Sequence, residues 1–147
     1  MTRSRPLTRL WIKSPPRWSK MVTMKLSQQK CVPCRGGVPP MKRSLIKEYI
    51  KKVNPGWRVK HVELPGAKDG EGAKIVRRFT FKNFAAALEF VNQVGAIAEG
   101  EDHHPNIHLT NWNKVKLVLF THKINGLHAN DFILAAKIDK LAHDFEG

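Results

Sequence analysis

Apolar residues recur at two spacings between Met41 and Gly147, and each spacing predicts one kind of element. Helical spacing occurs in residues 41–53, 84–97 and 129–144, and the alternation typical of strands occurs in residues 57–64, 74–81, 107–110 and 115–121. The expected order is therefore α-β-β-α-β-β-α. This order predicts an α+β domain, in which a four-stranded antiparallel sheet carries helices on one face.

Turn and cap residues separate the expected elements. Pro55-Gly56 should end the first helix, and the Gly-rich residues 65–72 should link the first two strands. Asn111-Trp112-Asn113 predicts a tight turn between the last two strands. Asn83 is expected to cap the start of the second helix, and Gly100 is expected to end it.

Charge is distributed unevenly along the 147 residues. The first 47 residues hold 12 of the 26 Lys and Arg residues and no acid, so the remainder, with 14 basic and 12 acidic residues, has a formal net charge of only +2. A domain that binds nucleic acid usually carries its basic charge on the folded surface, so direct nucleic-acid binding is not expected. Residues 1–40 are interpreted as a basic, disordered extension and residues 41–147 as the folded domain.

The acid-free N-terminus, which contains Arg and Ser, is typical of an organellar transit peptide. Leu7, Leu10 and Trp11 would share one face of a short helix, which favours a mitochondrial presequence, with a plastid one as the second choice. A disordered basic tail, or translation that starts at Met21 or Met24 and leaves the protein in the cytoplasm, is the alternative. No run approaches the roughly 18 apolar residues of a membrane span, so no membrane partner is expected.

Cys31 and Cys34 form a single C-x-x-C pair within the extension. Without a second pair, cysteines of this chain cannot complete a four-ligand zinc site. The neighbouring prolines disfavour a thioredoxin-like motif. Reduced cysteines in a flexible segment are the first expectation, and redox chemistry or metal binding across subunits are the alternatives.

Five of the seven histidines lie between Glu99 and Asp131. Pro105 favours an extended backbone at His104, so His103 and His104 should point to opposite sides. His122 is expected at the end of the last strand and Asp131 in the first turn of the last helix. Because imidazole titrates near neutral pH and a carboxylate can fix its tautomer, two such histidines with Asp131 could donate one proton and accept another.

Structural explanations of the same residues remain open. Asp131 could simply interact with the helix dipole, and the His-His-Pro sequence could be an exposed turn. His104 and His108 are four residues apart, but Pro105 prevents the single helical face of a zinc-binding H-E-x-x-H motif and the Glu is missing. No metal site is expected.

The ordered pattern of this window resembles the signature of the pterin-4a-carbinolamine dehydratases. The residues that carry the resemblance are Glu99-x-x-Asp102-His103-His104-Pro105, Trp112-Asn113-Lys114-Val115, Thr121-His122, Gly126-Leu127 and Asp131, with Pro55-Gly56-Trp57 and Phe79-x-Phe81-x-x-Phe84 further upstream. The resemblance covers about residues 42–146. It implies a four-stranded antiparallel sheet with helices on one side, and removal of water from 4a-hydroxytetrahydropterin to give quinonoid dihydropterin without a metal or organic cofactor.

The resemblance also implies roles for individual residues. His103, His104 and His122 match active-site histidines, Asp131 matches a supporting aspartate, and Glu99, Asp102 and Trp112 are expected on the substrate side. His103 and His122 are the expected acid/base groups, while His104 binds substrate or shares that role.

His108 and His128 are expected to be bystanders. His128 stands where Ser or Thr usually caps the last helix, so a cap weaker by about 1 kcal/mol is expected. The resemblance further implies a homo-oligomer, a dimer or a tetramer built from dimers. Because animal relatives also serve as dimerisation cofactors of a homeodomain transcription factor, a non-catalytic interaction protein is the second hypothesis.

Overall fold

The computed structural model describes residues 25–33 and 36–146. The predicted presequence and Cys34 lie outside these residues. The expected order of elements is confirmed: α2 (Arg43–Ile50), β1 (Arg58–Lys60), β2 (Lys74–Thr80), α3 (Phe84–Glu101), β3 (Asn106–Thr110), β4 (Lys114–Leu119) and α4 (Ala129–Phe145). Two short 3-10 helices are also present in the described chain, η1 (Leu26–Gln28) and η2 (His122–Ile124).

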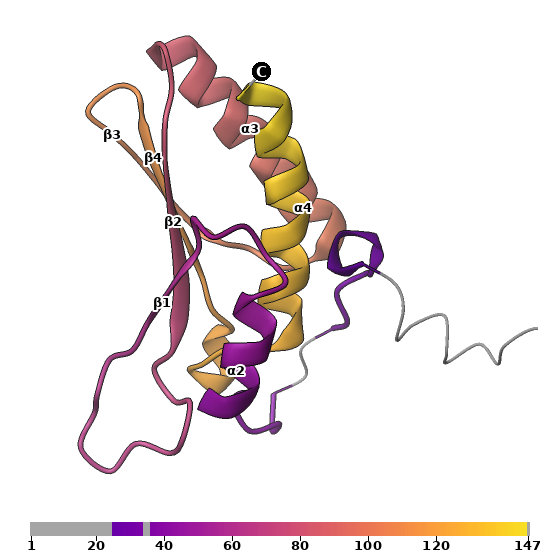
Figure 1. Cartoon of the computed structure of the whole chain (residues 1–147), viewed down its shortest axis with the longest axis vertical. Coiled ribbons are helices and arrows are strands. Elements are labelled where there is room, and N and C mark those ends of the chain that lie inside the picture. The colour runs from indigo at the N-terminus through magenta and orange to yellow at the C-terminus, as the bar shows by residue number, and fades with distance from the viewer. Residues whose placement is uncertain (1–24, 34–35, 147) are drawn as a thin grey trace, which may run out of the picture.

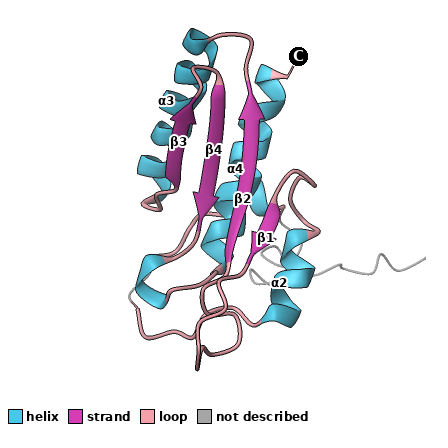
Figure 2. Ribbon diagram, turned by 90° about the vertical axis from the view of Figure 1, so that its left-hand side faces the viewer, coloured by secondary structure: helices cyan, strands magenta, loops and turns pink. Residues whose placement is uncertain are grey.

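The four strands form one antiparallel sheet in the order β1-β2-β4-β3. In the central pair, Ile75 of β2 lies opposite Leu119 of β4, and Phe79 lies opposite Val115. Helices α3 and α4 pack side by side on one face of the sheet, as Figure 1 shows with the sheet nearly edge-on. Figure 2 looks onto the opposite face, with both helices behind the strands. The predicted α+β fold is therefore confirmed.

The core lies between the sheet and these helices. In β4 the predicted alternation holds, because Val115, Leu117 and Leu119 are at most 1% exposed. Phe90 of α3 and Phe132 of α4 are fully buried against the same layer. Burial of each such side chain contributes about 1.5–3 kcal/mol, so this layer holds the connections at the sheet's ends in fixed positions.

The ends of α3 agree with the prediction at one terminus only. Asn83 caps the start, since its Oδ1 accepts a hydrogen bond from the Ala86 N–H at 2.8 Å. The predicted end at Gly100 is wrong, because the helix continues to Glu101 and Asp102 takes the left-handed conformation (φ 51°). A short polar residue such as Asp can adopt this conformation, and the helix then closes through the Asp102 N–H. The chain reverses at Asp102 and brings His103 back toward α4.

Two further local predictions differ from the structure, and the expected cap of α4 is present. The first strand covers only residues 58–60, because residues 61–64 do not pair in the sheet. Trp57 precedes the strand, and its Nε1 donates to Asp139 Oδ1 on α4 at 2.6 Å. The last strand ends at Leu119, so His122 opens η2 and does not end a strand. His128 does cap α4, as its Nδ1 accepts from the Asn130 N–H at 3.1 Å within a complete capping box.

The described part of the N-terminal extension packs against the folded body. Leu26 and Cys31 are 9% and 8% exposed, and η1 lies against α4. For residues 25–33 this differs from the expected loose segment. None of the helices in the described chain is both long and apolar enough to cross a membrane.

Candidate active site

The predicted histidines His103, His104 and His122 line one cleft of about 660 Å³, which we call the histidine cleft. It lies between the connection from α3 to β3 and the turn that follows β4. Its lining residues are Pro33, Asp102, His103, His104, Pro105, Asn106, Phe120, Thr121, His122 and Lys123. Of the three backbone segments that form the cleft, residues 102–106 and 120–123 carry the predicted histidines, and the third contributes Pro33 from the N-terminal extension.

The buried pair His103 and Asp131 lies at the base of this cleft. Their Nε2 and Oδ1 atoms are 2.7 Å apart, and the two residues are 9% and 0% exposed. A carboxylate can only accept, so Nε2 of His103 is the donor to Asp131, and in the neutral imidazole the lone pair is then on Nδ1. The pair fixes the His103 tautomer in a form that can accept a proton at Nδ1.

Asp131 is held by two further donors at its second oxygen. Thr121 Oγ1 donates to Oδ2 at 2.9 Å, and the His128 backbone N–H donates to the same atom at 2.9 Å. Asp131 is the third residue of α4, so this second bond completes the capping box. The carboxylate also lies near the positive end of the helix dipole. Asp131 therefore both caps the start of α4 and contacts His103.

His104 and His122 stand at the rim of the cleft. His104 is exposed, as expected from its opposite orientation to the buried His103, and its Nε2 lies 2.6 Å from Glu99 Oε1. His122 is also exposed, and its ring lies 4.1 Å from that of Phe120, centroid to centroid. Both rim imidazoles are therefore open to solvent, whereas His103 is largely covered.

The other two predicted substrate-side residues lie in different places. Asp102 lines the cleft as well as ending α3. Trp112 lies in the turn between β3 and β4, is 61% exposed, and does not line the cleft. The cleft adjoins Asn106 at the other end of β3, and a five-residue strand separates its ends by about 13 Å. The structure of this chain therefore does not bring Trp112 to the histidines.

Sequence reasoning missed several residues of the site. Thr121 is 3% exposed and orients Asp131, and Asn130 is 2% exposed beside it. Three polar residues close together at a helix start, His128, Asn130 and Asp131, are a sequence signal that could have indicated a functional site as well as a helix cap. Pro33 also lines the cleft, although it belongs to the extension. Nothing in the local sequence indicates that contact.

Cys31 shows no sign of reactivity. Burial, and next the nearby Glu101 carboxylate, raise the pKa of its thiol to about 12, so it stays protonated at neutral pH. A thiol in that state is a poor nucleophile and metal ligand. Across residues 25–33 and 36–146, no cluster of three or more His, Cys, Asp or Glu side chains has the arrangement of a metal site.

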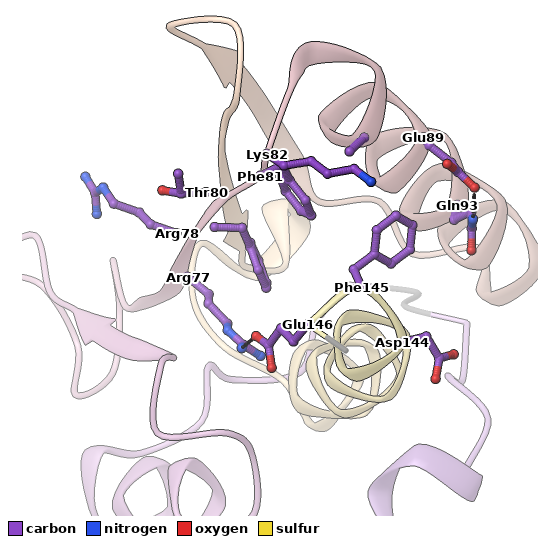
Figure 3. Close-up of a pocket in the computed structure, with 12 residues that line it drawn as sticks. Arg77, Arg78, Thr80, Phe81, Lys82, Glu89, Gln93, Asp144, Phe145 and Glu146 are labelled. Atoms are coloured by element: carbon purple, nitrogen blue, oxygen red, sulfur yellow. Dashed lines mark hydrogen bonds and ion pairs between the residues drawn. The ribbon is translucent and has the colours of Figure 1, made fainter.

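A larger cavity of about 740 Å³ lies at the other end of the helix pair, near the C-terminus of α4. Figure 3 shows it between Phe81, Lys82, Glu89 and Phe145, with Arg77 and Glu146 in contact. Arg77 is already engaged, because it pairs with Asp139 at 2.5 Å and with Glu146 at 3.3 Å. No histidine or cysteine lines this cavity, so it lacks the imidazoles that the histidine cleft offers for acid/base chemistry near neutral pH.

Known proteins are similar to this chain over most of its length, including the segments that form the histidine cleft. Residues 39–141 match the family model described as Pterin 4 alpha carbinolamine dehydratase. A relative from Alkaliphilus metalliredigens, provisionally named a pterin-4-alpha-carbinolamine dehydratase, is 44% identical over 118 residues, 78% of this chain and 94% of the relative. A relative of the same provisional name from Halorhodospira halophila is 47% identical over 118 residues, 80% and 98% of the two chains.

A solved structure is also similar. The protein described as a transcriptional coactivator/pterin dehydratase from Brucella melitensis has a TM-score of 0.57 and 32% identity, over 70% of this chain and 98% of that one. The segment matched by the family model includes every lining residue of the histidine cleft except Pro33.

Proposed function

We propose that this chain, which belongs to the pterin 4 alpha carbinolamine dehydratase family, dehydrates 4a-hydroxytetrahydropterin to quinonoid dihydropterin. The observation that carries the proposal is the buried contact of 2.7 Å between His103 Nε2 and Asp131 Oδ1, at the base of a cleft with two more histidines at its rim. The enzyme would be a hydro-lyase that recycles tetrahydropterin.

The reaction needs one proton removed and one supplied. The N5 proton leaves, the C4a–O bond breaks, a double bond forms between C4a and N5, and the hydroxyl departs as water. His103 accepts the N5 proton at Nδ1, and Asp131 stabilises the resulting imidazolium. His122, which exchanges protons with solvent, supplies the proton to the leaving hydroxyl. No step requires electron transfer.

The remaining polar residues serve binding. His104 contacts the pterin or shares proton transfer, and Glu99 orients its imidazole from the last turn of α3. Asp102 offers a carboxylate to the donors of the pterin ring. Trp112, which the family pattern places on the substrate side, can contact a pterin only in the cleft of another subunit, because it does not line the cleft of its own chain.

The test is the dehydration rate of 4a-hydroxytetrahydropterin, generated in the assay by a pterin-dependent hydroxylase. The full-length protein should accelerate the reaction over buffer, and His103→Ala and His122→Ala should each remove most of the acceleration. His61→Ala is the matched control, because His61 is exposed and lies outside the cleft. Equal rates with and without protein, or full activity of both cleft variants, would refute the proposal.

A non-catalytic dimerisation cofactor of a transcription factor is the second candidate. It is favoured by the similar Brucella melitensis structure, whose description includes a coactivator role. The near-neutral charge of residues 48–147 argues against direct DNA contact, so this role would act through protein partners. Nuclear accumulation of a full-length fusion, together with co-purification of a transcription factor, would support it; exclusion from the nucleus would contradict it.

We further propose that residues 1–40 direct the protein to mitochondria, with plastids as the alternative destination. The proposal is supported by the absence of acids in the first 47 residues. A full-length fluorescent fusion should accumulate in the organelle, and a fusion that begins at Met41 should not. Cytoplasmic fluorescence from the full-length fusion would contradict the proposal.

Self-association is proposed as well, on the basis of family membership and of exposed apolar side chains on α3. Phe84 and Leu88 are 51% and 41% exposed, which is unusual for a helix that faces only water. Light scattering should give a multiple of the 16.7 kDa chain mass, and a mass of one chain would contradict the proposal.

A further inference from the structure

Residues 25–33 form a segment that crosses α4, which we call the N-terminal strap. Its clearest attachment is at Val32, where Asn130 makes two hydrogen bonds to the backbone. The Val32 N–H donates to Asn130 Oδ1 at 2.9 Å, and Asn130 Nδ2 donates to the Val32 carbonyl at 2.6 Å. One side chain thus satisfies both backbone groups of a single residue, as a neighbouring strand would.

A second attachment lies one residue earlier. The Cys31 N–H donates to Glu101 Oε2 at 2.8 Å, and Cys31 Sγ contacts the Asn130 carbonyl at 3.6 Å. Lys137 holds the other oxygen of Glu101. Burial alone would raise the pKa of Glu101, but the bonds from Lys137 and Cys31 outweigh it and lower that pKa. The carboxylate that anchors the strap is therefore ionised at neutral pH.

These attachments lie directly beside the proposed site. Asn130 precedes Asp131, the partner of His103, and Glu101 precedes Asp102, which lines the histidine cleft. The residue after Val32 is Pro33, which lines the same cleft. The strap lies before residues 39–141, the part matched by the family model, so it adds a wall that the matched domain alone does not supply.

We propose that Asn130 is a positioning residue of the histidine cleft, which clamps the strap at Val32 so that Pro33 closes one side of the pterin site. The identity of the ligand rests on the proposed function. Asn130 touches no reacting atom and acts through Val32 and Pro33. The Pro33 ring has no N–H and presents an apolar surface, which suits contact with a flat heterocycle and keeps water from that side.

A wall of this kind contacts the substrate and the transition state alike. Its loss should therefore raise KM and leave kcat nearly unchanged. A residue that only stabilised the fold would instead lower the amount of active protein, and one that acted in proton transfer would lower kcat. The ratio of the two effects separates these roles.

The experiment uses the full-length chain with Val32→Pro, which removes the N–H bonded to Asn130 and keeps the length of the strap. Val38→Pro is the matched control: both valines precede a proline, and they are 58% and 48% exposed. Asn130→Asp is the second variant, since it replaces the donor to the Val32 carbonyl by an acceptor. Circular dichroism first establishes that each variant is folded.

Two readouts follow strap docking and site function separately. In a Cys34→Ser background, Cys31 is the only thiol, and its reaction with a maleimide at pH 7 reports whether the strap is docked. Steady-state kinetics give KM and kcat. We expect Val32→Pro and Asn130→Asp to react about tenfold faster with maleimide and to show a KM raised about tenfold, as loss of one hydrogen bond would produce. Val38→Pro should match the parent protein in both.

Unchanged labelling of Cys31 in both variants would overturn the claim that Asn130 holds the strap at Val32. Faster labelling with an unchanged KM would overturn the claim that Pro33 closes one side of the site. If the parent protein shows no dehydratase activity, the proposed function fails, and the dissociation constant for a dihydropterin, measured by fluorescence, replaces KM. A constant raised by Val32→Pro would then still support the inference, whereas an unchanged constant, or no binding by the parent protein, would overturn it.

Discussion

Replacing Asp131 with Asn is expected to reverse the hydrogen bond that holds His103. Oδ2 of Asp131 accepts from Thr121 and from the His128 N–H, whereas among the described residues the donor to Oδ1 is His103. In Asp131→Asn, the amide oxygen should take the Oδ2 position, because the His128 N–H can only donate. The amide nitrogen then faces His103 Nε2 and must donate to it.

This reversal moves the histidine proton to Nδ1, so the lone pair proposed to accept the N5 proton is lost. We expect kcat to fall by ~10²–10⁴-fold, the usual contribution of general acid/base catalysis. The fold should lose about 1–3 kcal/mol, since one charge-assisted bond is exchanged for a neutral one at a site that is 0% exposed. Kinetics, urea unfolding and ¹⁵N NMR of the histidine side chains measure the three quantities.

Asp139→Asn provides the matched control on the same helix. Asp139 also accepts from three donors, namely the Asn54 N–H at 2.8 Å, Trp57 Nε1 at 2.6 Å and Arg77 at 2.5 Å. This variant should lose stability to a similar extent and keep its kcat when folded. The reasoning would be refuted if Asp131→Asn kept most of its kcat, or if the NMR spectrum still placed the His103 proton on Nε2.

Three further predictions concern other parts of the molecule. Lys137→Met removes a partner of Glu101 and should speed maleimide labelling of Cys31; unchanged labelling would show that the Glu101 anchor is dispensable. The pKa of Glu101 is lowered from its ordinary value, so its ionised form stabilises the fold at neutral pH and this contribution is lost as the pH falls through the lowered pKa. The loss of unfolding free energy in Glu101→Gln should therefore shrink on acidification, and a loss independent of pH would contradict this. Asn83→Ala should cost about 1 kcal/mol in urea unfolding by removing the cap of α3, with unchanged kcat; a stability equal to that of the parent protein would contradict the cap.

The order of elements could be predicted because the apolar periodicity is long and regular. In the 18-residue helix α3, buried residues recur every three or four positions, at Ala87, Phe90, Val94 and Ala98. In β4, every second residue from Val115 to Leu119 is buried. Element ends were less predictable, since they depend on single residues. The αL conformation of Asp102 ends α3 beyond Gly100, and Trp57 lies before β1 with its indole N–H bonded to the distant carboxylate of Asp139.

The histidines and Asp131 could be proposed from spacing, because each lies near the end of an element that periodicity located. Their supporting residues could not. Asn130 and Val32 are 98 residues apart in the sequence, so no local pattern predicts the hydrogen bond between them. Trp112 matches the family pattern in sequence, but it does not line the cleft of its own chain, because the turn that holds it lies at the other end of β3.

The rate of 4a-hydroxytetrahydropterin dehydration by the full-length wild-type protein tests the central claim most directly. The account predicts a rate proportional to protein concentration and well above that of buffer, with most of it lost in His103→Ala and retained in His61→Ala. A rate equal to that of buffer, from protein shown to be folded, would contradict it.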